Sequence, residues 1–320
     1  MSRESEFIDS LRPLAGNAAA RGLEDDAAIL EVAAGTLVLT CDTLVESVHY
    51  RPDDPPADVA WKLIAVNLSD LAAKGARPIG VLLSYALGPR DWDAAFVAGL
   101  ATALNTFDLP LLGGDTVAMP EGAPRALTLT AIGGAAGPVP SRAGARPGDR
   151  LWVSGTIGDS GAGLRALMAG RDEPAGLIER YRNPRPRIEA GQRLAPIVRA
   201  MMDVSDGLLI DAKRMAEASG CRAVIGLDDI PRSEALIGIA GVGLDATLGA
   251  ATAGDDYELL FAAAAERTAE ILALAAAIGM PLSPIGAFEA GSGLSLTLEG
   301  KTVSLPRSLG YEHGAKVRSG

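Results

Sequence analysis

Short apolar segments alternate with longer segments of helical periodicity through the first half of this chain. The segments 36–45 (TLVLTCDTLV), 79–87 (IGVLLSYAL) and 125–134 (RALTLTAIGG) are apolar and rich in strand-forming residues. Between them, 56–75 and 92–107 carry apolar side chains at helical spacing. Strands that alternate with helices build sheets covered by helices, so the sequence predicts an α/β protein.

A break in composition divides the chain. The segment 133–150, GGAAGPVPSRAGARPGDR, is its densest stretch of glycine and proline, and such stretches favour turns over regular structure. A strand pattern restarts at 151–155 (LWVSG), and 294–306 (LSLTLEGKTVSLP) is typical of a terminal hairpin. We therefore expect two α/β domains, at 1–137 and 138–320, and 320 residues suffice for two hydrophobic cores.

The charge balance narrows the choice of partners. Asp and Glu number 40 against 29 Lys and Arg, a formal net charge of −11. Nucleic acid is disfavoured, because Lys and Arg contacts to phosphate dominate its binding. No apolar run reaches the roughly 18 residues that span a bilayer, and MSRESEFIDS lacks the apolar core of a signal peptide. Two cysteines, Cys41 and Cys221, indicate no disulfide framework, so we expect a cytoplasmic protein without membrane or nucleic-acid partners.

Acidic residues gather at six places where an apolar segment meets glycine, serine or threonine. Hard cations such as Mg²⁺ prefer carboxylate oxygens and often share them with phosphate, so the six clusters together favour a metal-assisted phosphate site. The acidic residues are Glu24, Asp25 and Asp26; Asp42; Asp70; Asp115; Asp203 and Asp206; and Asp255, Asp256 and Glu258.

Taken singly, the same residues have simpler interpretations. Asp206 could cap the helix that follows it, and Asp115 in GGDT could be an ordinary turn residue. Asp70 could face solvent from an amphipathic helix.

Common catalytic motifs are absent from the sequence. The only histidines are His49 and His313, and there is no G-x-S-x-G, H-E-x-x-H or C-x-x-C. Gly300-Lys301-Thr302 resembles the end of a P-loop, but Ser295 replaces the glycine that the loop requires. Phosphoryl transfer relies on positioning and on stabilisation of charge. An acceptor that is itself a phosphate needs no general base, so such a transfer fits this acidic chain.

The motifs that carry these acids resemble one family. The segments DDAAIL, CDTLVESVHY, VNLSDLAAKGARP, LLGGDTV, SRAGARPGD, SGTIGDS, MDVSDGL and GDDYELLF are similar, in this order, to those of thiamine-monophosphate kinase. That family belongs to the superfamily of aminoimidazole ribonucleotide synthetase and selenophosphate synthetase. The resemblance covers nearly the whole chain, from about Gly22 to Tyr311.

The resemblance implies a two-domain aminoimidazole-ribonucleotide-synthetase-like architecture, with mixed sheets covered by helices. It also implies a homodimer joined through the N-terminal sheets. The implied reaction is transfer of the γ-phosphoryl group of ATP to thiamine monophosphate with several Mg²⁺ ions, by direct in-line transfer.

Site residues carry over by motif. The implied metal ligands are Asp26, Thr40, Cys41, Asp42, Asp70, Asp115, Asp203 and Asp206; the implied ATP contacts are Gly114, Asp115, Arg142 and Ser205; and the implied thiamine monophosphate contacts are His49, Asp255 and Tyr311.

Three positions depart from the family pattern. Glu24 stands where a glycine is usual, Cys41 where a hydroxyl residue is usual, and Asp255 where a glutamate is usual. One alternative is another ATP-using member of the superfamily. The lack of an N-terminal cysteine disfavours selenophosphate synthetase, and NLSDLAA with Tyr311 disfavours aminoimidazole ribonucleotide synthetase. A second alternative is a metal- and nucleotide-binding regulator without turnover.

Overall fold

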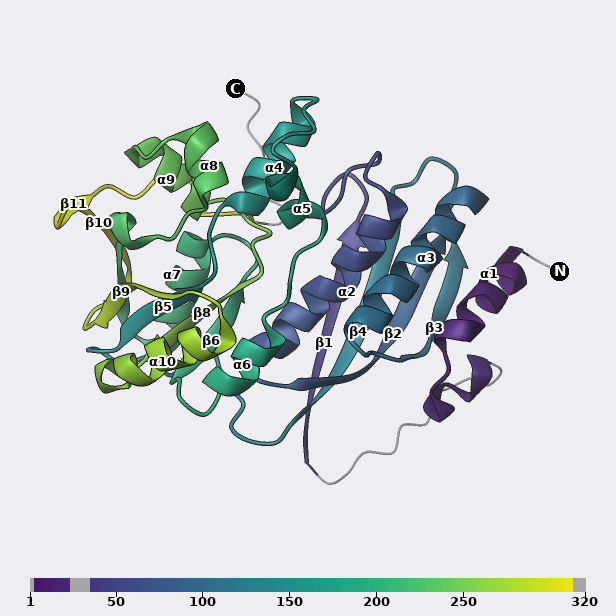
Figure 1. Ribbon diagram of the computed structural model, residues 1–320, viewed down its shortest axis with the longest axis horizontal. Coiled ribbons are helices and arrows are strands. Elements are labelled where there is room, and N and C mark those ends of the chain that lie inside the picture. Colours follow the sequence, from purple (N-terminus) through teal and green to yellow (C-terminus); the bar gives the residue numbers. More distant parts are fainter. Residues whose placement is uncertain (1–2, 24–34, 313–320) are drawn as a thin grey trace. The chain divides into compact units, whose positions relative to one another are not determined.

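The computed structural model describes residues 3–23 and 35–312. Two compact units divide the chain, each built around its own sheet (Figure 1). The first unit comprises Met1–Ala72 and Ala76–Gly137, and the second comprises Ala73–Gly75 and Pro138–Gly320. Within the described ranges, no helix combines the length and the hydropathy that a membrane span requires.

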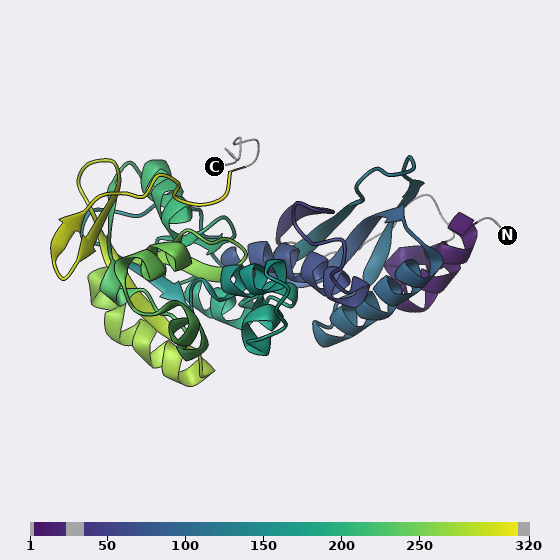
Figure 2. The ribbon, with the colours of Figure 1, turned by 90° about the horizontal axis from the view of Figure 1, so that it is seen from above.

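The first unit is a four-stranded sheet with two long helices on one face (Figures 1 and 2). The strand order is β1-β4-β2-β3; β2 and β3 run parallel, and the other pairs are antiparallel. Its elements are α1 (Arg3–Leu11), η1 (Arg12–Leu14), η2 (Ala18–Leu23), β1 (Thr36–Val45), α2 (Pro56–Ala73), β2 (Arg77–Leu87), α3 (Arg90–Thr106), β3 (Leu111–Ala118) and β4 (Ala126–Ala135).

The apolar side of α2 packs as its periodicity predicts. Ile64, Leu68 and Leu71 have no exposed surface, and they recur at helical spacing. Burial alternates along β1, because successive side chains of a strand point to opposite faces. Leu39, on the face away from the helices, is 64% exposed.

The strand β3 differs from what the sequence suggests. GGDT, which reads as a turn, lies inside β3, where Gly114 pairs with Leu83 of β2. A Cβ at Gly114 would lie 1.8 Å from the carbonyl oxygen of Leu83. Glycine is therefore required at this position for close strand pairing rather than for a turn.

The second unit is a seven-stranded mixed sheet with helices around it (Figure 1). The strand order is β11-β10-β7-β9-β5-β8-β6, in which only β10 and β7 pair in parallel. Its elements are β5 (Arg150–Ser154), α4 (Asp159–Met168), α5 (Ala175–Arg182), α6 (Ile188–Leu194), β6 (Ala200–Val204), α7 (Leu208–Ser219), β7 (Arg222–Gly226), η3 (Leu227–Asp229), α8 (Glu234–Ala240), α9 (Leu244–Ala251), β8 (Glu258–Ala263), η4 (Ala265–Arg267), α10 (Thr268–Ile278), β9 (Leu282–Glu289), β10 (Gly293–Leu298) and β11 (Lys301–Val303).

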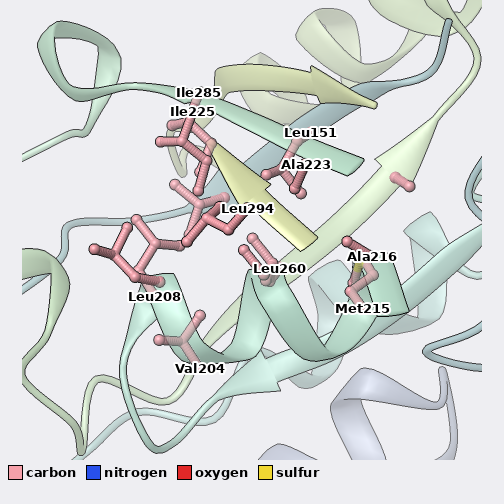
Figure 3. Close-up of a cluster of buried hydrophobic side chains, with 14 of the residues drawn as sticks. Leu151, Val204, Leu208, Met215, Ala216, Ala223, Ile225, Leu260, Ile285 and Leu294 are labelled. Atoms are coloured by element: carbon pink, nitrogen blue, oxygen red, sulfur yellow. The ribbon is translucent and has the colours of Figure 1, made fainter. Parts of the chain in front are cut away.

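A buried apolar cluster joins α7 to this sheet (Figure 3). Leu208 and Met215 of α7 belong to the same cluster as Leu151, Ile225 and Leu260 of three strands, and all five are fully buried. Burying a side chain of this size stabilises the fold by about 1.5–3 kcal/mol. The apolar side of α7, from Leu208 to Met215, is therefore held against this sheet.

The predicted terminal hairpin is confirmed as β10 and β11. Glu299 and Gly300 both have positive φ, 49° and 73°, the backbone of a two-residue hairpin turn. Gly300-Lys301-Thr302 thus belongs to a hairpin and not to a phosphate-binding loop.

Candidate active site

Asp42 and Asp70 form a pair of carboxylates in the first unit. Asp42 lies in the middle of β1 and Asp70 lies on α2, where it accepts a short hydrogen bond from the hydroxyl of Thr40. Burial, and then the charge of Asp70, raises the pKa of Asp42 to about 6. Asp70 therefore faces β1 and not solvent, which rules out the simpler interpretation of this residue.

Asn67 connects the same helix to the exposed edge of β1. Its Oδ1 accepts a hydrogen bond of 3.2 Å from the backbone N–H of Asp42, and its Nδ2 donates to the carbonyl of Leu63. Because β1 is an edge strand, its outward N–H groups need partners from outside the sheet. A fully buried asparagine on α2 thus holds the backbone of Asp42 in place.

Asp115 lies on the opposite face of this sheet from Asp42. Across the sheet, Asp115 pairs with Ser84, Ser84 with Thr128, and Thr128 with Thr43. Thr43 is one residue after Asp42 on β1, so Asp115 and Asp42 belong to neighbouring rows of paired residues. Neighbouring rows point to opposite faces, so these two carboxylates do not converge within one sheet.

A cavity of about 620 Å³ surrounds Asp115. Its polar wall includes Gly113, Gly114, Asp115 and Thr128, and its apolar wall includes Leu11 of the N-terminal helix. A volume of this order suits a nucleotide-sized ligand.

His49 follows β1 in the first unit. The backbone N–H of Val45 donates to Nδ1 of His49 at 3.0 Å, and Nζ of Lys62 donates to its carbonyl at 3.1 Å. Because Nδ1 accepts a hydrogen bond, the neutral ring carries its proton on Nε2. His49 is therefore set as a hydrogen-bond donor through Nε2.

Three segments of the second unit meet where the strands β5 and β6 end and β8 begins. β5 and β6 each pair antiparallel with β8, so their carboxyl ends lie beside the start of β8. The segments that meet there are 155–158, 205–207 and 254–257. The carboxyl ends of strands are where α/β folds commonly place their ligands.

Asp206 is held by a basic residue of α7. Nη1 of Arg214 donates to Oδ2 of Asp206 at 2.5 Å and to Oδ1 of Asp211 at 2.8 Å. Oδ2 of Asp211 accepts the N–H groups of Asp206 and Gly207, which precede α7, at 3.1 and 3.2 Å, and no side chain caps the start of this helix. The capping interpretation of Asp206 is therefore wrong.

The other predicted ligands of the second unit lie close to this loop. The N–H of Asp255 donates to the carbonyl of Ser205 at 2.8 Å, and the N–H of Tyr311 donates to the carbonyl of Asp206 at 2.9 Å. Asp203, 7% exposed, is the fourth residue of β6. The structure thus brings together Asp203, Ser205, Asp206, Asp255 and Tyr311.

Two predicted site residues lie elsewhere, and a third cannot be placed. Asp26 is outside the described residues. Cys41 is exposed, and its side chain lies on the opposite face of β1 from the side chains of Thr40 and Asp42. Only its main chain could therefore contact a metal held by those two residues. Arg142 is exposed and follows Ser141, whose carbonyl accepts a hydrogen bond from the N–H of Met201 near the start of β6. Met201 and Ser205 are four residues apart along the strand, a distance of roughly 13 Å.

Oxygen donors suited to a hard cation are present. Asp42, Asp70 and Thr40 offer two carboxylates and a hydroxyl, and a cation would oppose the burial and the charge of Asp70 that together raise the pKa of Asp42. Over residues 3–23 and 35–312, no three His, Cys, Asp or Glu side chains lie close enough to hold a metal by themselves. This group therefore fits Mg²⁺ that completes its shell with water and phosphate, as Mg²⁺ usually does.

Known proteins share both halves of this chain. Residues 24–135 match the N-terminal domain of AIR synthase related proteins, and residues 146–299 match their C-terminal domain. The thiamine-monophosphate kinase of Caulobacter vibrioides is 40% identical over 315 residues, which is 95% of this chain and 88% of that protein. This chain belongs to the thiamine-monophosphate kinase family. The predicted family and α/β fold are thereby confirmed.

Solved structures of the family superpose on more than nine tenths of the chain. Thiamine-monophosphate kinase from Stenotrophomonas maltophilia is 37% identical with a TM-score of 0.81, covering 93% of this chain and 96% of that one. AaThiL, solved in complex with AMPPCP and TMP, is 30% identical with a TM-score of 0.76, covering 97% of each chain.

Sequence reasoning missed the residues that hold the predicted ligands. Asn67 supports Asp42, and Asp211 with Arg214 supports Asp206. Helical spacing offered a signal, because Asn67 precedes Asp70 by three positions on α2 and Arg214 follows Asp211 by three on α7.

Proposed function

We propose that this protein transfers the γ-phosphoryl group of ATP to thiamine monophosphate, giving thiamine diphosphate and ADP. The observation that carries the proposal is identity of 33–40% to thiamine-monophosphate kinases, reaching 95% of the chain. A relative of 30% identity binds AMPPCP, an ATP analogue, together with TMP, which supports the pairing of substrates.

The nucleotide contacts carried over from the family motifs are Gly114, Asp115, Arg142 and Ser205. In the first unit, Gly114 and Asp115 line the cavity of about 620 Å³ beside β3. In the second unit, Ser205 follows β6, and the guanidinium of Arg142 would reach a phosphate from its exposed loop.

Thiamine monophosphate would be recognised through three groups. The Nε2–H of His49, fixed by the hydrogen bond to Nδ1, suits an anionic oxygen. The exposed ring of Tyr311 suits the cationic thiazolium, and the carboxylate of Asp255 adds a second attraction for the cation. The acceptor oxygen of the substrate phosphate is already anionic, so no residue needs to remove a proton.

Metal ligands would be the carboxylates Asp26, Asp42, Asp70, Asp115, Asp203 and Asp206, with the hydroxyl of Thr40 and the main chain at Cys41. Bound Mg²⁺ would offset the charge of the polyphosphate and favour in-line transfer. Residues of the protein would align the phosphates for transfer, and Arg214 would keep Asp206 oriented.

We also propose that two copies pair through the open face of the four-stranded sheet. Leu37, Leu39 and Val117 on this face are 41%, 64% and 42% exposed. Apolar side chains grouped on one exposed face are typical of a protein–protein interface. Leu39→Asp should convert a dimer to a monomer in analytical ultracentrifugation. A wild-type monomer at micromolar concentration would contradict this pairing.

A product assay tests the function directly. Purified protein with ATP, Mg²⁺ and thiamine monophosphate should give equal amounts of ADP and thiamine diphosphate, resolved by chromatography. ADP that forms only with a different phosphate acceptor would point to another activity of the superfamily. Metal-dependent ATP binding without either product would favour a regulator.

A further inference from the structure

Glu258 is a buried carboxylate outside the predicted site. It opens β8, has no exposed surface, and accepts hydrogen bonds from Nη2 of Arg180 at 2.6 Å and from Nε and Nη2 of Arg187 at 2.7 and 2.5 Å. The hydroxyl of Ser154 donates to it at 2.6 Å. Both oxygens are thus occupied by charge-assisted bonds, the strongest kind of hydrogen bond in proteins.

The neighbouring glycine is shaped to this carboxylate. Gly155 has a positive φ of 58°, and a Cβ there would lie 2.3 Å from Oε1 of Glu258. The end of β5, the helix α5 and the segment before α6 therefore all converge on one side chain. We call Glu258, which is fully buried, and Arg180 and Arg187, whose side chains are 18% and 19% exposed, the buried triad.

The turn that leads into Glu258 is strained. Asp255 and Tyr257 have positive φ of 67° and 51°, which residues other than glycine rarely adopt. Such conformations persist only where the surroundings over-determine them. Asp255, predicted to contact the substrate, sits at the strained end of this turn.

Contacts on three sides hold the turn. The N–H groups of Asp255 and Tyr257 donate to the carbonyls of Ser205 and Val204, each at 2.8 Å. The N–H of Gly158 donates to both oxygens of the buried Asp256, at 3.0 and 2.9 Å. The buried triad fixes the remaining side, where the turn becomes β8.

Stability alone does not account for a buried triad. Replacing a buried ion triad with apolar residues of similar volume is often neutral or stabilising, because desolvation offsets the attraction between the charges. What two guanidinium groups on one carboxylate supply is a fixed geometry, since the planar fork of each arginine accepts few orientations.

We propose that Glu258, held by Arg180 and Arg187, is a positioning residue for thiamine monophosphate. The buried triad keeps the 254–257 turn in its strained form and so holds Asp255 where the substrate cation binds. This inference rests on the proposed function. It adds a specificity role for three residues that do not touch the substrate.

The test separates KM for each substrate from kcat. Glu258→Gln keeps the volume but removes the charge, so KM for thiamine monophosphate should rise about tenfold, equivalent to about 1.4 kcal/mol. KM for ATP should rise by about twofold at most, because Ser205 is the one proposed nucleotide residue bonded to this turn, and it is bonded only through its carbonyl. Arg187→Lys keeps the charge but loses the fork, and should raise the same KM about threefold.

Glu270→Gln is the matched control, because Glu270 pairs with Arg267 on the surface of the same unit at side-chain exposures of 46% and 50%. It should leave both KM values unchanged. If Glu258→Gln does not fold, Arg187→Lys decides the question alone.

Two results would overturn the proposal. One is an unchanged KM for thiamine monophosphate in variants that fold, with loss only of melting temperature and of active fraction. The other is an equal rise in KM for both substrates. A wild-type protein that forms no thiamine diphosphate would refute the proposed function itself, and this inference with it.

Discussion

In the first unit, Asp42 and Asp70 repel each other, and neither forms an ion pair within the described ranges; in the second unit, Asp206 and Asp211 share Arg214. No Lys or Arg of the described residues pairs with the first two carboxylates, so a bound cation would balance their charge. The second pair is balanced by the protein itself. The difference teaches that the two acidic clusters are built differently: the second is held in place by a basic residue of its own unit, whereas the first offers the unpaired carboxylates that the proposed metal role requires.

Chelation should have the largest effect. EDTA should abolish turnover and excess Mg²⁺ should restore it, because an acidic site cannot accept polyphosphate unaided. Mg²⁺ alone, at about 100 times its Kd, should stabilise the wild type by about 2.7 kcal/mol in thermal unfolding. Asp42→Asn should lose more of this stabilisation than Asp206→Asn. Turnover that survives chelation would contradict the comparison.

Asp42→Asn should reduce kcat on the order of 100-fold or more, since it removes a ligand-quality carboxylate. Folding should not suffer. The pKa of Asp42 in the fold is about 6, above its ordinary value of 3.8, so the stability this group contributes below about pH 4 is lost as pH rises through 6. At pH 7.5 the melting temperature should therefore hold or rise. A melting temperature that falls together with kcat would indicate a structural role.

Arg214→Gln should show the reverse pattern, with a loss of stability. It leaves the fully buried side chain of Asp211 without its cation and should cost about 1–3 kcal/mol in urea unfolding. Lys213→Gln is the control, because its pair with Glu217 is exposed and should be worth about 0.5 kcal/mol or less. Equal effects of the two variants would remove the distinction between the clusters.

Asp256→Asn should have the smallest effect, visible only in pH dependence. Burial raises the pKa of Asp256 well above 3.8, so wild-type stability should fall as pH rises from about 4. The variant keeps an oxygen for the N–H of Gly158 and should show a flatter profile between pH 4 and 7. Parallel profiles of Asp256→Asn and wild type would show that this carboxylate is ionised in the fold.

Much of the fold follows from local pattern. The periodicity of α2 and the apolar strands β1, β2 and β4 were readable because burial on one face leaves a regular repeat in the sequence. β3 was not, because Gly113 and Gly114 carry no strand signal. Glycine at 114 is required by its close pairing with Leu83 of β2, a contact that is distant in sequence.

The candidate site was predictable as residue types but not as geometry. The family motifs gave Asp203, Ser205, Asp206, Asp255 and Tyr311, which the fold brings together. That Asp42 and Asp115 lie on opposite faces depends on sheet register, which no local pattern states. The sequence also does not show that Glu258 is buried, because its hydrogen-bond partners come from three separate segments.

The position of β5 in its sheet has a consequence for synthesis. All strands of the first sheet have been synthesised once β4 is complete, but β5 is synthesised before both of the strands it pairs with, β8 and β9. Ser154 and Glu258 are 104 residues apart, so at 5–20 residues per second the ribosome needs about 5–20 s to supply β8. Throughout this interval, the apolar strand Leu151–Trp152–Val153 has two unpaired edges. The nascent second unit is therefore the part of this protein that most needs a chaperone.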